Sequence, residues 1–174
     1  IVATGGFDPA WPAGVFQTQN RASARIHGGE VFARYDIGGG ISTTAAVGYA
    51  KGSYQTLDGA RVPLSTIEPF KANAALAYAA GRGRWGAALS AEFADAKRPG
   101  RGAQFRQPAY TTFSLAAYWR FSEHAWLNLG LHNLTDAQYW RYANIRGIAA
   151  TNVVEQERRT EPGFNTSVSL QLRY

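Results

Sequence analysis

The feature that most constrains this chain is an alternation of apolar and polar residues with period two, which recurs along most of its length. It is clearest in Gly163–Tyr174, where the even positions from Phe164 to Leu172 are mostly apolar and the odd positions are polar. Successive residues of a β-strand face opposite sides, so this period is typical of strands with one apolar face. The sequence therefore predicts an all-β fold.

The same alternation predicts seven strands. They are Glu30–Ile37, Ile41–Tyr49, Phe70–Tyr78, Trp85–Phe93, Tyr110–Phe121, Trp126–Asn133 and Gly163–Tyr174. Phe16–Gln19 is a candidate eighth strand. No segment shows a helical period of comparable length, and none has the roughly eighteen consecutive apolar residues of a transmembrane helix.

The connections between these strands alternate between short and long. Gly38–Gly40, Gly81–Arg84 and Ser122–Ala125 are short, whereas Lys51–Glu68, Ala96–Pro108 and Thr135–Pro162 are long. Outer-membrane barrels have tight periplasmic turns and longer extracellular loops. The connections therefore favour an antiparallel transmembrane β-barrel, with the long loops outside the cell.

Alternation alone does not say whether the apolar face meets lipid or a protein core, and a soluble barrel or sandwich stays open as an alternative. Aromatic residues such as Trp85, Phe93 and Trp119 lie at the ends of the apolar stripes, as in the two interfacial girdles of membrane barrels. The polar face carries several basic residues with few acidic partners, which a small closed barrel would have to bury. We therefore expect part of a larger barrel, with a self-contained eight-stranded outer-membrane protein as the alternative.

Composition excludes several classes of function. The chain of 174 residues has no Cys, so it has neither disulfides nor thiolate metal ligands, and no metal site is predicted. The net charge is +6, but the basic residues are scattered rather than gathered on one element, so nucleic acid is not an expected partner. A hydrolytic Ser–His pair between His132 and Ser114 or Ser169 would lie on the polar face, away from lipid. We therefore predict no catalytic residues and no enzymatic activity.

Three segments resemble TonB-dependent outer-membrane receptors, in the order in which that family has them. Leu127–Tyr139 is similar to the penultimate strand and its Asn-Leu-x-Asp-x-x-Tyr motif, matched by Asn133, Leu134, Asp136 and Tyr139. The ending Glu161–Tyr174 resembles the final strand, with the terminal aromatic residue at Tyr174, and Ala24–Glu30 resembles a recurring strand.

This resemblance implies a location, partners and a domain position. Residues 1–174 would form the C-terminal portion of a barrel of about twenty-two strands in a bacterial outer membrane, without the plug domain. The chain's own N-terminal strands and plug, the energising TonB system acting through that plug, and outer-membrane lipid with lipopolysaccharide would be its partners. Transport of an iron-bearing ligand would be its function.

Within the family, the segment Tyr139–Gly147 resembles haem and haemoprotein receptors, with ferric-siderophore receptors as the alternative. Haem would be the transported ligand and not a bound cofactor. Its main ligating His would lie upstream of this chain, which leaves His132, on the polar face, as the only histidine placed for contact. The ligand-contact candidates are Trp140 and Tyr142 as stacking rings, Arg141 and Arg146 as propionate partners, and His132. The alternative places Trp140 in the upper aromatic girdle and the arginines toward lipopolysaccharide phosphates, and it gives His132 a structural hydrogen bond, which is the interpretation we favour for that residue.

Overall fold

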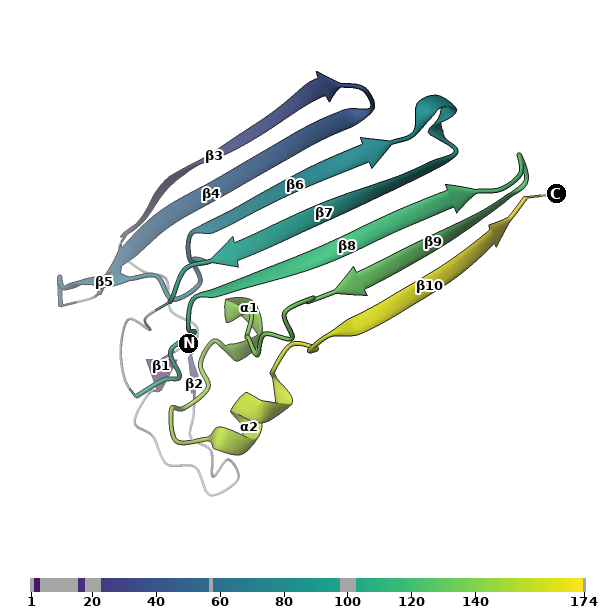
Figure 1. The fold of residues 1–174 in the computed structure, drawn as a ribbon. Coiled ribbons are helices and arrows are strands. Elements are labelled where there is room, and N and C mark those ends of the chain that lie inside the picture. Colours follow the sequence, from purple (N-terminus) through teal and green to yellow (C-terminus); the bar gives the residue numbers. More distant parts are fainter. Residues whose placement is uncertain (1, 4–15, 18–22, 57, 98–102, 174) are drawn as a thin grey trace.

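The computed structural model describes residues 2–3, 16–17, 23–56, 58–97 and 103–173. Its main feature is one antiparallel sheet of seven long strands, ordered as they follow one another in the chain. They are β3 (Ser23–Gly38), β4 (Ile41–Gln55), β6 (Lys71–Ala79), β7 (Trp85–Ala94), β8 (Tyr110–Arg120), β9 (Ala125–His132) and β10 (Asn165–Leu172) (Figure 1). Each of the seven predicted strands is present, and the all-β fold class is confirmed.

The first hairpin is longer than predicted. β3 begins at Ser23 instead of Glu30, and β4 continues to Gln55 instead of ending at Tyr49. Glycines interrupt the apolar pattern here but allow the backbones to approach closely, because a Cβ on Gly28 would collide with the carbonyl oxygen of Tyr49. The ladder between the two strands therefore continues where the alternation fades.

The smaller elements lie beside this sheet. β5 (Arg61–Pro63) pairs with the end of β4 and is the eighth strand of the sheet. The candidate eighth strand Phe16–Gln19 is not part of the sheet, because β2 (Phe16–Gln17) pairs with β1 (Val2–Ala3). Residues 18–19 lie outside the described residues. The short helices are η1 (Gly81–Gly83), α1 (Tyr142–Ile145) and α2 (Val153–Arg158). In the described ranges, no helix is long and apolar enough to cross a membrane.

The two ends of the sheet differ as the connections predicted. The short turns and the end of β10 lie together at one end, whereas β5, α1, α2 and the long connections lie at the other (Figure 1). In the β3–β4 turn, Gly38, Gly39 and Gly40 have φ values of 101°, 61° and 84°. Glycine adopts this region without the steric cost that other residues meet, which explains a turn made of three glycines.

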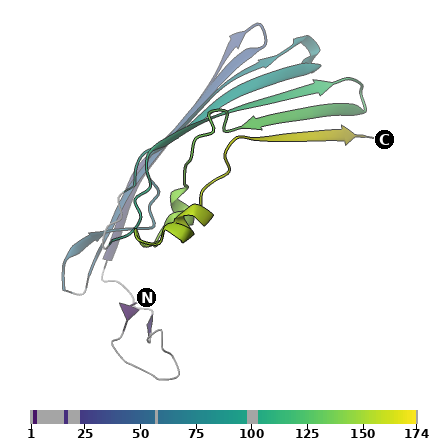
Figure 2. The ribbon, with the colours of Figure 1, turned by 60° about the horizontal axis from the view of Figure 1, so that its bottom comes forward.

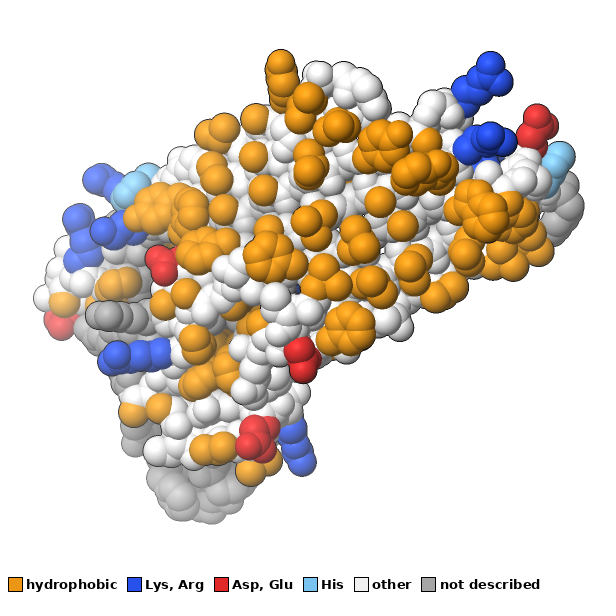
Figure 3. Space-filling model, in the orientation of Figure 1, with side chains coloured by type: hydrophobic (Ala, Val, Ile, Leu, Met, Phe, Trp, Pro, Cys, Tyr) orange, Lys and Arg blue, Asp and Glu red, His pale blue; other side chains and the backbone are white. Residues whose placement is uncertain are grey.

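The register places most of the large apolar residues of the seven strands on one face. A row such as Leu76, Leu89, Leu115 and Leu131 crosses four strands at directly paired positions. Hydrophobic side chains cover this face, and charged side chains gather toward its ends (Figure 3). Leu170 and Leu172 are 56% and 68% exposed.

The opposite face is polar and hollowed. A depression lined by Thr44, Asn73, Ser90, Glu92 and Ser114 crosses successive strands on this face. The buried residues lie mostly in or beside the long connections, as Tyr139, Tyr142 and Ile145 do. Apolar side chains therefore do not converge on a dry core between the strands. The soluble-barrel alternative is wrong, and the apolar face is the lipid-facing one.

The sheet is curved but open (Figure 2). Its order runs from β10 to β3, and within the described part of the chain these two outer strands do not pair with each other. A transmembrane sheet cannot leave backbone groups unpaired in lipid. Because β3 and β10 do not pair with each other among their described residues, these strands do not form a closed eight-stranded barrel.

Candidate ligand-contact site

The long connection between β9 and β10 carries most of the candidate residues, and it starts with the predicted motif. Asn133 is 3% exposed and has a φ of 50°. Its side-chain amide donates to the carbonyl oxygens of Ala137 (2.9 Å) and Pro162 (3.2 Å), and its oxygen accepts from the Ala137 N–H (3.0 Å). Asn tolerates this backbone region better than most residues. Asn133 therefore holds the start of the connection against its end.

Asp136 completes the same junction. Its Oδ1 accepts a hydrogen bond of 2.7 Å from the Phe164 N–H, at the start of β10. A Cβ on Gly163 would collide with this oxygen, so the Pro-Gly step before the last strand fits the carboxylate. The Leu134 N–H donates to the Phe113 carbonyl (2.8 Å), and the Leu134 side chain is 37% exposed. These motif residues join β8, β9 and β10.

Tyr139, the last motif residue, is 9% exposed and packs on Tyr110, with the ring centroids 4.5 Å apart. Its carbonyl accepts a hydrogen bond of 3.0 Å from the Glu161 N–H. The two ends of the loop are therefore held together here as well. Tyr174, the remaining motif residue, lies outside the described residues.

Of the two aromatic candidates, Tyr142 is the more buried. It is 2% exposed, and its hydroxyl donates to the Ser65 carbonyl oxygen at 2.7 Å. The Lys97 ammonium lies 5.6 Å from its ring centroid. Burial raises the pKa of the Tyr142 phenol and lowers the pKa of Lys97, where the Glu68 carboxylate opposes the shift. In this conformation the Tyr142 ring packs in the loop and presents no face to a ligand.

Trp140 is partly buried. Its indole N–H donates to the Gln156 carbonyl oxygen at 2.8 Å, in α2. Its ring meets Phe105 edge-on, with the centroids 5.2 Å apart. Trp140 thus fixes α2 against the loop between β7 and β8.

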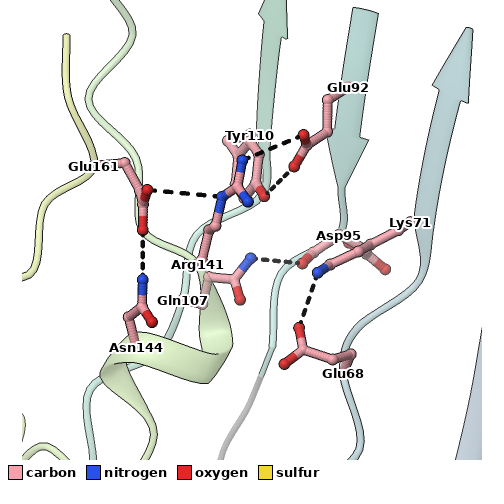
Figure 4. Close-up of polar contacts among 9 residues, drawn as sticks. All are labelled: Glu68, Lys71, Glu92, Asp95, Gln107, Tyr110, Arg141, Asn144 and Glu161. Carbon is pink, nitrogen blue, oxygen red and sulfur yellow. Dashed lines mark hydrogen bonds and ion pairs between the residues drawn. The ribbon is translucent and has the colours of Figure 1, made fainter.

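Arg141 lies at the centre of a charged network (Figure 4). Its guanidinium is 3.6 Å from Glu92 on β7 and 3.7 Å from Glu161 near the end of the loop. Glu92 also accepts a hydrogen bond of 2.8 Å from the Tyr110 hydroxyl, and Glu161 accepts one of 2.7 Å from the Asn144 amide. Burial lowers the pKa of Arg141, but Glu92 above all raises it, and the net shift is upward. Arg141 therefore binds the loop to the wall of the sheet.

His132 and Arg146 lie in different surroundings. His132 is exposed on the polar face and hydrogen-bonds with Ser167 Oγ through Nε2 (3.1 Å), rather than with Ser114 or Ser169. It lines one hollow together with Glu92, Arg141 and Glu161. Arg146, directly after α1, is exposed and does not line that hollow. The structure therefore brings His132 and Arg141 together, and it places Trp140, Tyr142 and Arg146 elsewhere.

Sequence reasoning missed Glu92, Tyr110 and Glu161 as parts of this site. Glu92 lies on a predicted strand, but its partner Arg141 is far away in sequence, and no local spacing relates the two residues. Tyr110 lies diagonally opposite Glu92, since Glu92 pairs with Thr112. The strand register shows that the side chains of Glu92 and Tyr110 are neighbours, but this register can be read only when the strand pairing is known.

The open antiparallel sheet, its lipid-facing apolar side and its long folded loops at one end define an outer-membrane β-barrel. A family model described as "TonB dependent receptor-like, beta-barrel" matches residues 2–134. The chain therefore belongs to the TonB-dependent receptor family. It is an outer-membrane protein of Gram-negative bacteria and not an enzyme.

Similar proteins agree with this membership. Hemoglobin-haptoglobin utilization protein B of Neisseria meningitidis serogroup A is 26% identical over 186 residues, covering 92% of this chain and 23% of that protein. Hemoglobin-haptoglobin-binding protein A of Haemophilus influenzae is 25% identical over 192 residues, covering 94% of this chain and 18% of that protein. The solved structure of the copper transporter OprC has a TM-score of 0.72 and 26% identity, covering 87% of this chain and 24% of its own. This chain thus spans less than a quarter of the length of these relatives.

Proposed function

We propose that this chain supplies C-terminal barrel strands to a TonB-dependent receptor that takes up haem from a haemoprotein. The observation that carries the proposal is the similarity to two proteins named for hemoglobin-haptoglobin, which extends over 92% and 94% of the chain. The motif at the β9–β10 junction and the neighbouring segment Tyr139–Gly147 support it. Residues 1–174 would be one portion of a longer barrel domain.

The hollow lined by His132 and Arg141 is the part of the site best suited to an anionic ligand. The guanidinium of Arg141 is 48% exposed and lies more than 3.5 Å from both carboxylate partners. Charge-assisted hydrogen bonds are usually shorter than these two contacts, so Glu92 and Glu161 hold the N–H groups of Arg141 only loosely. A haem propionate can therefore accept hydrogen bonds from the same N–H groups. Haem is cargo in this proposal. Arg146 and Trp140 would meet the ligand only if the loop rearranges.

The proposed receptor needs partners beyond this chain. β3 and β10 would pair with strands supplied by the rest of the barrel, because open edges are not tolerated in lipid. The plug and the TonB system acting through it would supply the energy for uptake.

Growth of a haem-requiring bacterium that lacks its own haem receptors tests the proposal. The cells would express the full-length receptor and receive haemoglobin, free haem, a ferric siderophore or copper as separate supplements. We expect growth on haemoglobin or haem that disappears when the TonB system is deleted. Uptake of a siderophore or copper without haem would contradict the proposed ligand.

A further inference from the structure

The extended β3–β4 hairpin creates a groove that the receptor assignment leaves unexplained. Pairing between β4 and β6 ends at Gly48 and Lys71, while β4 continues to Gln55. β5 covers only the last part of this free edge. A groove of about 680 Å³ opens between the β4 edge and the connection leading into β6.

The hairpin extension has a basic outer face. The register places His27 opposite Lys51 and Arg61 opposite Gln55, on the same face as the lipid-side residue Val47. Arg25 lies two residues from His27 on that face. At the paired positions of this extension the outer face carries no acidic residue. Basic side chains gather beside a histidine at the loop end of the sheet (Figure 3).

The groove beside these basic residues also has apolar walls. Tyr49, Leu64, Ile67 and Phe70 line it together with His27, Lys51, Arg61 and Lys97. Tyr49 is 52% exposed and marks the place where the apolar stripe of β4 gives way to Lys51. An aromatic ring followed by a basic residue is typical of the boundary between acyl chains and headgroups.

The acidic residues of the groove already have partners. Glu68 lies 3.1 Å from the Lys71 ammonium, and Asp95 accepts a hydrogen bond of 2.7 Å from the Ala96 N–H. The ion pairs formed among the described residues include neither Lys51 nor Arg61. These two cations are therefore available to an external anion.

We propose that this groove binds the phosphorylated headgroup of an outer-leaflet glycolipid, with the acyl chains lying on the apolar face below Tyr49. Lys51 and Arg61 pair with the phosphates, and His27 lies beside them. The site is distinct from the hollow of Arg141, because its basic residues project from the lipid-facing side of the strands. Continuity with the apolar face favours a lipid over a free anion.

Binding of diphosphoryl lipid A to the purified full-length receptor in detergent, followed by native mass spectrometry, tests this site. The double variant Lys51→Gln/Arg61→Gln should bind the lipid about tenfold more weakly, because each basic residue near an anionic headgroup contributes measurably. The same double variant should lose less affinity for monophosphoryl lipid A, which carries one phosphate fewer. The matched control is Arg82→Gln/Arg84→Gln, with the same charge change in the short turn at the opposite end, and its affinity should stay within about twofold.

A second variant separates charge from folding. Lys51→Arg/Arg61→Lys keeps both charges and should bind diphosphoryl lipid A as the unaltered receptor does. Three results would overturn the proposal: equal weakening in the groove and control variants, no weakening in the Gln variant, or displacement of the lipid by inorganic phosphate at equal concentration. The last result would indicate a site for free phosphate.

Discussion

Asn133 and Asp136 both direct their side chains at backbone groups around the β9–β10 junction. Together they bond to Ala137, Pro162 and Phe164, which belong to the two ends of one long loop. Both residues have a φ of 50°. The recurring motif of the family is explained here by loop closure.

Replacing Asp136 with Ala should lower the free energy of unfolding by about 1–3 kcal/mol, because the Phe164 N–H loses its acceptor. Asp136→Asn keeps an oxygen at the same place and should cost less. Urea unfolding of the full-length receptor in lipid vesicles, followed by tryptophan fluorescence, measures both. Equal stability of the Ala variant and the unaltered protein would show that the bond is not stabilising.

Arg141 is the candidate residue whose removal separates stability from ligand binding. Arg141→Gln should change the free energy of unfolding by no more than about 1 kcal/mol, because its two ion pairs are long and partly exposed. If the proposed function is correct, haem affinity should fall by roughly tenfold, as expected for one lost charged hydrogen bond.

Haem titration of the full-length receptor, followed by absorbance, measures that change. Arg159→Gln is the control, since Arg159 pairs with Glu155 on α2 and does not line the hollow. Equal haem affinity of Arg141→Gln and the control would contradict the role of Arg141.

At the scale of elements, the alternation predicted each long strand and its two faces, because side chains such as Leu89 and Leu129 follow a strict period of two. The added length of β3 and β4 was not predictable in this way. Glycines such as Gly28 carry no side chain, so they leave no apolar signal where the backbone stays paired.

The candidate site was only partly predictable from the sequence. Residue types in the loop suggested contact with a ligand, and Arg141 does line the polar hollow. Burial of Tyr142 against Ser65 depends on packing between loops far apart in sequence, which no local pattern encodes. The same holds for the contact of Arg141 with Glu92.

Two neighbouring positions of β9 test the assignment of its faces. Leu129→Arg places a charge on the lipid side and should cost about 2–4 kcal/mol near the membrane midplane. Asn128→Arg places the same charge on the polar face, where Asn128 bonds Ser169 Oγ at 3.2 Å, and should cost much less. Unfolding in lipid vesicles compares the two free energies. A larger cost for Asn128→Arg would reverse the assignment of lipid and lumen.

At the scale of the whole molecule, the long strands pair in the order in which they occur, and among the residues that the structure describes the two outer edges have no partner strand. We expect residues 1–174 alone not to close into a barrel, because β3 and β10 would expose backbone groups to lipid. Added to vesicles, this chain should unfold in SDS without heating, whereas the full-length receptor should resist. An SDS-resistant monomer of the chain alone would contradict the open sheet.

The unequal lengths of the strands also give the barrel wall an uneven height. β3 has 16 residues and β9 has 8, which at about 3.3 Å per residue corresponds to roughly 53 and 26 Å. Both strands reach the end with the short turns, so the difference appears at the loop end. If the proposed function is correct, a protein as large as a haem carrier would therefore meet the β3–β4 hairpin while still well above the Arg141 hollow, whereas free haem could pass beside it. The carrier protein would then first contact the receptor at the β3–β4 hairpin, and the haem would contact it lower on the same wall, at the Arg141 hollow.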